Sequence, residues 1–373
     1  MRKRKVVIAC LAFLYLATSS ANATFSLAGK SCKQVGKVTV VDEISYKCRK
    51  SENKLVWKIN KSVPKKVKEA PTSFADVVEK TSGAYVGAWN AFNIKNSESK
   101  PILVNKEFLI GPNSKLINLK VSDSFDQGTK LFYGFKQPES FTAIYYNYED
   151  RFWAKDKLKE LGFESRSVEI DRGCPTFSHC NGATAGKANG NTGLAQFGIP
   201  RANEQDIYHL NGAIEIHEYT HLVQFMQFVG KPAEDRNIGY LPSWFIEGHA
   251  HAVSNLGISK SLSDYEVIRS HWFKTSPNEE LKSFQARDIE RFYDSLMPDK
   301  QNSEMFGYVY TLGYITIETL IALKGFDSPA NLIVEISNGE SFESAFEKIY
   351  GLPWASAKPI LAQVVSKQFL ANS

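Results

Sequence analysis

The segment His217-Glu218-Tyr219-Thr220-His221 constrains the fold of this chain more than any other feature. Residues four apart lie on the same face of an α-helix, one turn apart, so both imidazoles can point at one ion. Glu218 is rotated by about 100° around the helix, so it need not bind the ion and can reach a water beside it. The pattern fits zinc held by two protein nitrogens, with a base next to an open position. The alternative is a chance match of packed helix residues.

A metal site needs at least a third ligand, and we expect it in the downstream segment LPSWFIEGHAHAV. His221 is followed by LVQFMQF, which offers no third histidine on the same run. Pro242 suits the first turn of a second helix, and Glu247 then lies among Trp, Phe and Ile, where a merely solvated glutamate is unusual. Small residues that would let this helix approach the first closely are Gly248, Ala250 and Ala252. The rival third ligands are His249 and His251.

With these residues the chain resembles the gluzincin metallopeptidases, in the form called peptidase MA-like. The resemblance rests on His217-Glu218-x-x-His221 followed by Pro242-x-Trp244-x-x-Glu247-Gly248-x-Ala250, and it spans roughly residues 140–360. It implies that His217, His221 and Glu247 bind Zn²⁺. It also implies that Glu218 is the general base, which then carries the proton to the leaving group.

A later helix supplies a candidate for a second catalytic group. Gluzincins of the aminopeptidase type carry a Tyr-x-x-Gly helix start, whose tyrosine donates a hydrogen bond to the oxyanion. Tyr310-Thr-Leu-Gly313 matches that spacing, so the resemblance implies Tyr310 as the donor. Tyr308 is the alternative, and a tyrosine that merely lines the core is a third interpretation.

The chain departs from the family at two points. Several relatives place an aspartate four residues after the ligand glutamate to orient a histidine ligand, and here that position is His251. A neutral imidazole can also accept a hydrogen bond, so the surroundings of the ligands could be rebuilt. The Gly-x-Met-Glu-Asn strand that binds a free amino terminus is absent, and NGNTGLAQFG in that region has no carboxylate. This second departure favours an endopeptidase.

The first 23 residues have the features of a secretory signal peptide: a basic start, an apolar run over residues 6–16, and Ala21-Asn22-Ala23 before the cleavage point. The apolar run is shorter than the ~20 residues of a membrane span. We therefore expect a secreted, extracellular chain without a transmembrane segment after cleavage. Removing four basic residues leaves 41 Lys and Arg against 40 Asp and Glu, a balance of +1 that argues against nucleic-acid binding.

The remaining charge is unevenly distributed along the chain. Residues 24–70 hold 12 Lys and Arg and 4 Asp and Glu, a balance of +8, so the rest of the mature chain carries −7. A basic head of this kind predicts contact with an anionic cell surface. The alternative is that the lysines only keep a small, poorly buried module soluble.

Four of the five cysteines remain after cleavage, and an even number in an exported protein predicts two disulfides. Local pairing, Cys32–Cys48 and Cys174–Cys180, is the simplest of the three connectivities. Zinc ligation by cysteine is the weaker interpretation, because the chain contains no C-x-x-C.

These observations predict an α+β protein: a small disulfide-bonded β module, then a two-lobed, gluzincin-like body with zinc between the lobes. Strands are expected within residues 36–57, 141–147 and 193–200. Helices are expected over 73–92, 148–162, 305–324, 341–350 and 354–371. The expected divisions are a signal peptide (1–23), a basic β module (24–59), a linker (60–72), a sheet-containing lobe (73–202) and a helical lobe (203–373).

The predicted function is that of a secreted zinc peptidase, acting on peptides or proteins and more specifically as an endopeptidase. One alternative is a non-catalytic cell-surface or cell-wall binding protein on a peptidase scaffold, in which the basic head is the active part. Another alternative is a zinc hydrolase of a non-peptide amide.

Overall fold

The computed structural model describes residues 27–41, 44–52, 54–59, 68–200, 207–235, 237–298, 300 and 303–372. The chain divides into two compact units between Val67 and Lys68. The expected signal peptide and residues 60–67 of the expected linker lie outside the described residues. Residues 68–72, which were expected to be part of the linker, belong to the second unit. Within that unit, the carboxylate of Glu69 forms an ion pair with Lys80 at 2.9 Å.

The first unit contains an antiparallel three-stranded sheet in the order β1-β2-β3. Its strands are β1 (Val38–Val41), β2 (Ile44–Ser51) and β3 (Lys54–Ile59). Tyr46 and Cys48 of β2 are fully buried, and Cys48 is bonded to Cys32, which confirms the local pairing. A module of this size buries little apolar surface, so the disulfide supplies stability that the core cannot.

The second unit is built on a mixed four-stranded sheet in the order β4-β5-β7-β6. Its strands are β4 (Asn105–Ile110), β5 (Ser140–Tyr146), β6 (Ala183–Lys187) and β7 (Thr192–Gly198). The first three in this spatial order, β4, β5 and β7, are parallel, whereas β6 is an antiparallel edge strand. The expected strands correspond to β5 and β7, while β4 and β6 were not expected from the sequence.

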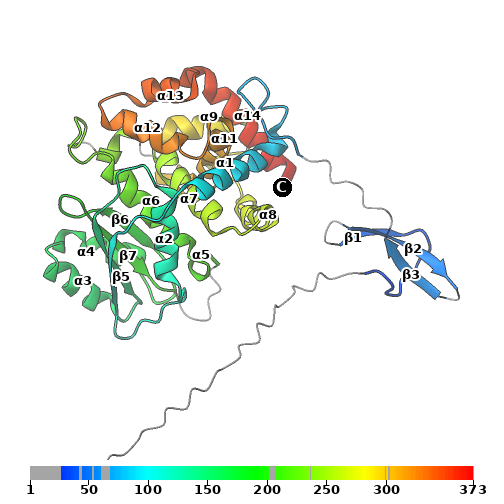
Figure 1. Cartoon of the computed structure of the whole chain (residues 1–373), viewed down its shortest axis with the longest axis horizontal. Coiled ribbons are helices and arrows are strands. Elements are labelled where there is room, and N and C mark those ends of the chain that lie inside the picture. Colours follow the sequence, from blue (N-terminus) through cyan, green and yellow to red (C-terminus); the bar gives the residue numbers. More distant parts are fainter. Residues whose placement is uncertain are drawn as a thin grey trace, which may run out of the picture. The chain divides into compact units, whose positions relative to one another are not determined.

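Helices cover both faces of this sheet (Figure 1). One face packs on α2 (Val121–Leu131) and α6 (Ala213–Met226), through a cluster that includes Phe125, Phe141 and Tyr219. The other face packs on α3 (Arg151–Glu160) and α4 (Ser167–Gly173), through a cluster that includes Ile144, Leu158 and Ile170. The apolar run of β5 therefore follows from burial on both faces, as in other parallel sheets.

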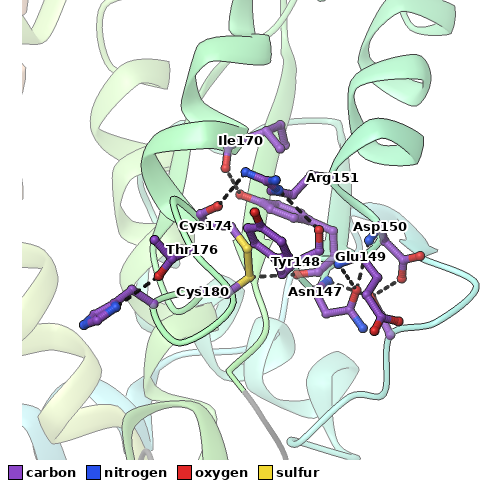
Figure 2. The surroundings of a disulfide bond; sticks show 12 residues. Asn147, Tyr148, Glu149, Asp150, Arg151, Ile170, Cys174, Thr176 and Cys180 are labelled. Carbon is purple, nitrogen blue, oxygen red and sulfur yellow. Dashed lines mark hydrogen bonds between the residues drawn. A yellow bond between two sulfur atoms is a disulfide. The ribbon is translucent and has the colours of Figure 1, made fainter.

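A second disulfide, Cys174–Cys180, closes the loop between α4 and β6, as the sequence predicted. Figure 2 shows this loop against the end of β5, where Arg151 donates from Nη1 to the carbonyl oxygen of Cys174 at 3.3 Å. The same guanidinium stacks on the ring of Tyr148 at 3.7 Å. The disulfide therefore joins the two ends of the loop, and Arg151 holds the end at Cys174. Strand β6 starts three residues after Cys180. Two disulfides are typical of proteins outside the reducing cytosol.

Every regular element described after residue 206 is helical. A further long helix, α1 (Ala84–Glu98), precedes the sheet and packs on α11. The helices after α6 are α7 (Ser243–Ile258), α8 (Leu262–Ser270), α9 (Ala286–Ser295), α10 (Ser303–Phe306), α11 (Tyr314–Lys324), α12 (Ser328–Ser337), α13 (Phe342–Tyr350) and α14 (Trp354–Asn372). The short helix α5 (Ile207–Leu210) precedes α6. The chain is therefore α+β.

The expected helix over residues 305–324 is interrupted. A π-helical turn, η5 (Val309–Gly313), lies between α10 and α11. Such turns insert an extra residue and occur frequently at functional sites. The stretch Glu304–Lys324 is long and apolar enough to cross a membrane, but 72% of its apolar window is buried inside the protein, as in a core helix.

The close contact between α7 and η5 depends on two glycines. A Cβ on Gly248 would lie 2.5 Å from the carbonyl carbon of Gly313, and a Cβ on Gly313 would lie 2.5 Å from the carbonyl oxygen of Trp244. Gly248 was expected to bring α7 close to α6. Its missing side chain instead makes room for η5, which carries Tyr310.

Gly248→Ala should therefore destabilise the protein by about 1–3 kcal/mol, because the new methyl group meets backbone that cannot move without displacing η5. Chemical unfolding of the variant and the wild type measures the difference. Gly239→Ala is the matched control, since a Cβ at Gly239 would have nothing within 4 Å. Equal stability of the two variants would contradict this account of the contact.

Candidate metal centre

The two histidines of the opening segment lie on α6, a helix buried on all sides. Gly212 precedes it with a left-handed backbone, φ 84°, and only one residue from Ala213 to Met226 is more than slightly exposed. A helix that is buried all round belongs to the core. His217 and His221 are 4% and 7% exposed, so their imidazoles lie in a setting where any polar atom needs a partner.

The structure brings together the three residues that the sequence predicted as ligands. The Nε2 atoms of His217 and His221 are 3.0 Å apart. Oε2 of Glu247, on α7, lies 3.2 Å from Nε2 of His217 and 3.3 Å from Nε2 of His221. In the described part of the chain, these are the residues whose donor atoms converge closely enough to hold a metal ion.

This triangle fits zinc in size. Zinc binds nitrogen and oxygen at about 2.0–2.1 Å, and the edge of a tetrahedron with bonds of that length is about 3.3 Å. The three distances between donor atoms, 3.0, 3.2 and 3.3 Å, lie close to that edge. A zinc ion could therefore bind all three residues with only a small adjustment of their side chains.

The charges of the cluster also favour a cation at its centre. Burial alone would raise the pKa of Glu247, but the positive charge of His221 and hydrogen bonds from both histidines hold it well below its usual value. Burial opposes protonation of His221, yet the Glu247 carboxylate raises the pKa of His221 to about 9. Burial lowers the pKa of His217. The carboxylate of Glu247 therefore favours one positive charge at the triangle, which is the proton of His221 when no metal is bound.

The outer nitrogen of each histidine is fixed by a hydrogen bond, which leaves Nε2 turned toward the centre. Nδ1 of His221 lies 2.8 Å from Oε1 of Gln224, and that amide donates from Nε2 to the carbonyl oxygen of Ile246 at 3.0 Å. Gln224 therefore ties the imidazole of His221 to α7. Outer contacts of this kind orient metal-binding histidines.

His217 is held by Tyr208, a residue of α5 that the sequence did not single out. The Tyr208 hydroxyl lies 3.0 Å from Nδ1 of His217, 3.1 Å from Nδ1 of His251 and 2.7 Å from Oγ of Ser254. His251, at the position where relatives carry an aspartate, thus contacts the ligand through a tyrosine. The hydroxyl of Tyr208 lies between the Nδ1 atoms of His217 and His251 and connects the two imidazoles.

His249 and His251, the rival third ligands, lie outside the triangle. Nδ1 of His249 is 3.2 Å from Nε2 of Gln224, and burial lowers the pKa of His249 to about 3. His249 therefore stays neutral. Both histidines belong to the outer contacts of the cluster, one through Gln224 and the other through Tyr208.

Tyr208→Phe should lower zinc affinity by about 10- to 100-fold, because it removes the hydroxyl that orients His217. Competition with a chromogenic chelator measures the affinity. Tyr293→Phe is the matched control, since it removes a buried hydroxyl bonded to Thr316 at 2.7 Å, away from the cluster. Unchanged affinity in Tyr208→Phe, or an equal loss in the control, would contradict the orienting role.

Glu218 lies beside the triangle without belonging to it. The residue is 3% exposed, and its Oε2 has no hydrogen-bond partner among the described residues. Burial raises the pKa of Glu218 to about 8, while the charges of His221 and Arg166 oppose the rise. A buried carboxyl with a free oxygen next to a metal-sized triangle has the properties of a proton acceptor.

Of the two candidate tyrosines, Tyr310 lies at the cluster. Its ring centroid is 6.2 Å from that of His217. Burial, the charges of Glu247 and Glu218, and a hydrogen bond to Glu247 all raise the pKa of Tyr310, so the phenol keeps its proton. The hydroxyl of Tyr308 instead donates to the carbonyl oxygen of Ser276 at 3.1 Å.

Two cavities adjoin the cluster and share the lining residues Ala183, His217, Glu218 and Tyr310. The first cavity has a volume of 230 Å³; His221 and Glu247 also line it, and its large apolar lining residues are Phe225, Ile238 and Ile246. The second, the mixed cavity, has a volume of 440 Å³ and is also lined by Tyr208, Trp272, Thr275 and Thr311. Space for a ligand therefore extends from the cluster in more than one direction.

The edge strand β6 forms part of the wall of the first cavity through Ala183, Thr184 and Ala185. This strand was hard to predict, because its sequence ATAGK is short and contains a glycine. Its backbone pairs with β7 on one side only. An edge of this kind can pair with an extended chain.

Compared with known proteins, the chain matches no family model, and no curated protein and no solved structure is similar to it.

Proposed function

We propose that this chain is a zinc-dependent peptidase of the gluzincin type. The observation that carries the proposal is the triangle of His217, His221 and Glu247, whose donor atoms are spaced as around a tetrahedral zinc ion. The buried carboxyl of Glu218 beside the triangle, with a free oxygen, supports hydrolysis rather than a purely structural metal.

Zinc in such a site polarises a carbonyl group and lowers the pKa of a water molecule. Glu218 takes the proton of the attacking water and passes it to the leaving amine, because it lines both cavities beside the triangle and its Oε2 has no competing hydrogen-bond partner among the described residues. Tyr310 donates a hydrogen bond to the oxygen that becomes negative during attack. Tyr208 and Gln224 keep the two imidazoles in the orientation that binding requires.

The substrate is a peptide or protein segment in an extended conformation. Its backbone pairs with the open side of β6, and one of its side chains enters the first cavity, where Phe225 and Ile246 can contact the apolar part of that side chain. An internal segment fits this arrangement, because among the described residues no carboxylate lines either cavity apart from Glu218 and Glu247. The proposal is therefore an endopeptidase, with the sheet-containing and helical parts acting as two lobes around the metal.

Secretion agrees with this activity. The expected signal peptide would direct export, and the two disulfides would form in an oxidising compartment. The enzyme would then act outside the cell.

Tyr310→Phe should lower kcat by about 10²–10³-fold, because the hydrogen-bond donor to the oxyanion is lost. The zinc content should change little, because the substitution removes no proposed zinc ligand. Steady-state kinetics on a peptide that the wild type cleaves measures the effect. Tyr308→Phe is the control and should keep most of the activity, since its hydroxyl is engaged with Ser276. A larger loss in Tyr308→Phe than in Tyr310→Phe would reverse the assignment.

The proposed function is tested with peptides that have free ends and the same peptides with both ends blocked. The zinc-loaded chain should cleave both sets at internal bonds, and mass spectrometry identifies the products. Cleavage only of peptides with a free amino terminus would make the enzyme an aminopeptidase. Failure to cleave any peptide at full zinc content would favour the non-catalytic or non-peptide alternatives.

A further inference from the structure

In the N-terminal module (residues 27–59), one face of the sheet is not covered by any segment of the module that the structure describes. Side chains that face each other across paired strands lie on the same face of the sheet, and the register of β2 with β1 and β3 therefore divides them into two sets. Cys48 lies opposite Trp57 on the first face, which residues 32–36 cross on the way from the disulfide to the strand β1. No described residue of the module crosses the second face in this way.

This second face, the basic face, is dominated by cations. Arg49, Lys54 and Lys58 are exposed, Lys47 is partly exposed, and Val38 is 50% exposed. None of the described side chains on the basic face is acidic. The described residues of this face are Val38, Lys47, Arg49, Ser51, Lys54, Val56 and Lys58.

The basic face contains a like-charge pair at its centre. Lys47 of β2 lies directly opposite Lys58 of β3, and like charges in that relation destabilise a sheet. Neither lysine, nor Arg49 or Lys54, has an ion pair or a side-chain hydrogen bond with any described residue. An anion placed over the pair would relieve the repulsion and bring its charge within reach of all four cations.

We propose that the basic face binds a linear polymer with regularly spaced phosphate groups, such as a phosphodiester polymer of a cell envelope. Charge complementarity carries the proposal: phosphates along one chain can contact successive cations on the flat face, with release of counterions. Its described side chains include no aromatic residue, and Val38 is its one apolar residue that is at least half exposed, whereas a membrane-inserting surface would carry aromatic residues and a wider apolar area. The proposal is independent of the metal site, since the module is a separate compact unit.

The experiment measures binding of residues 24–373 to immobilised inorganic polyphosphate, the probe of a phosphate polymer, over a range of salt concentrations. The wild type should bind at low salt and be released as salt rises. In the variant K47Q/K58Q, affinity at low salt should fall about tenfold, and the slope of log affinity against log salt should fall by about half. The matched control K33Q/K50Q removes the same charge from exposed lysines outside the basic face and should change affinity less than about threefold.

An equal loss in both variants would mean that only net charge matters, and would overturn the proposal. Absence of salt-sensitive binding by the wild type would overturn it as well. A parallel arm uses vesicles of phosphatidylglycerol and phosphatidylcholine. Tighter binding to these vesicles than to polyphosphate would replace the polymer with a membrane surface. Mass spectrometry of the Cys32–Cys48 peptide in each variant shows whether the module has folded.

Discussion

Replacing Glu218 with glutamine should leave the zinc content unchanged and lower peptide hydrolysis by about 10²–10⁴-fold. An amide has nearly the same size and shape as the carboxyl group, so the packing of α6 is preserved. It cannot accept the proton of the attacking water, and the step that Glu218 serves is lost. The residue lies outside the ligand triangle, which is why metal binding should survive.

The pair of readouts makes this prediction specific. Zinc is measured by elemental analysis, and hydrolysis by the rate of product formation from a peptide that the wild type cleaves. Glu215→Gln, one turn earlier on α6 and also buried, is the matched control for the change of a glutamate in this helix. An active Glu218→Gln enzyme would show that another group is the base.

His221→Ala should abolish tight zinc binding, because the two remaining ligands cannot hold a structural or catalytic zinc. The change also removes the charge that lowers the pKa of Glu247 and leaves a buried carboxylate with one imidazole. Loss of both zinc and hydrolysis is therefore expected. Elemental analysis after dialysis against trace zinc gives the stoichiometry.

The control for this prediction is His271→Ala, which removes an exposed histidine outside the cluster. That variant should bind zinc as the wild type does. Zinc at full occupancy in His221→Ala would contradict the assignment of the three ligands and would point to a site elsewhere in the chain.

The meeting of His217, His221 and Glu247 was predicted from the helical spacing of the two histidines and, for Glu247, from the resemblance to gluzincins. The spacing of His217 and His221 determines a shared helix face, and the apolar neighbours of Glu247 indicate that its carboxylate is buried for a reason. The local disulfides were predictable for a similar reason, since both loops are short. Few residues separate the two histidines and the cysteines of each disulfide, whereas Glu247 lies 26 residues after His221.

Features that depend on distant segments were missed. Tyr208 lies on a short helix whose sequence, IYHL, contains no pattern, and its contact with His217 and His251 arises only when α5 packs beside α6 and α7. The role of Gly248 was misassigned because a small residue permits close approach without specifying the partner. The π-helical turn that begins after Tyr308 and contains Tyr310 is equally invisible to a helical periodicity of 3.6.

The strands β4 and β6 were missed because neither alternates clearly between apolar and polar residues. Both lie at the ends of the sheet order, where only one neighbour constrains the sequence. The missed strand β6 matters most, since it forms part of the wall of the first cavity beside the cluster.

The most direct test of the central claim is the digestion of a mixed peptide library by residues 24–373 in three states. The chain is used first with one equivalent of zinc, then after removal of metal by a chelator, and then after return of one equivalent of zinc. We expect internal cleavage in the first state, none in the second, and recovery of the same cleavage sites in the third. Cleavage that persists in the metal-free chain, or none by the chain with one bound zinc, would contradict the proposal.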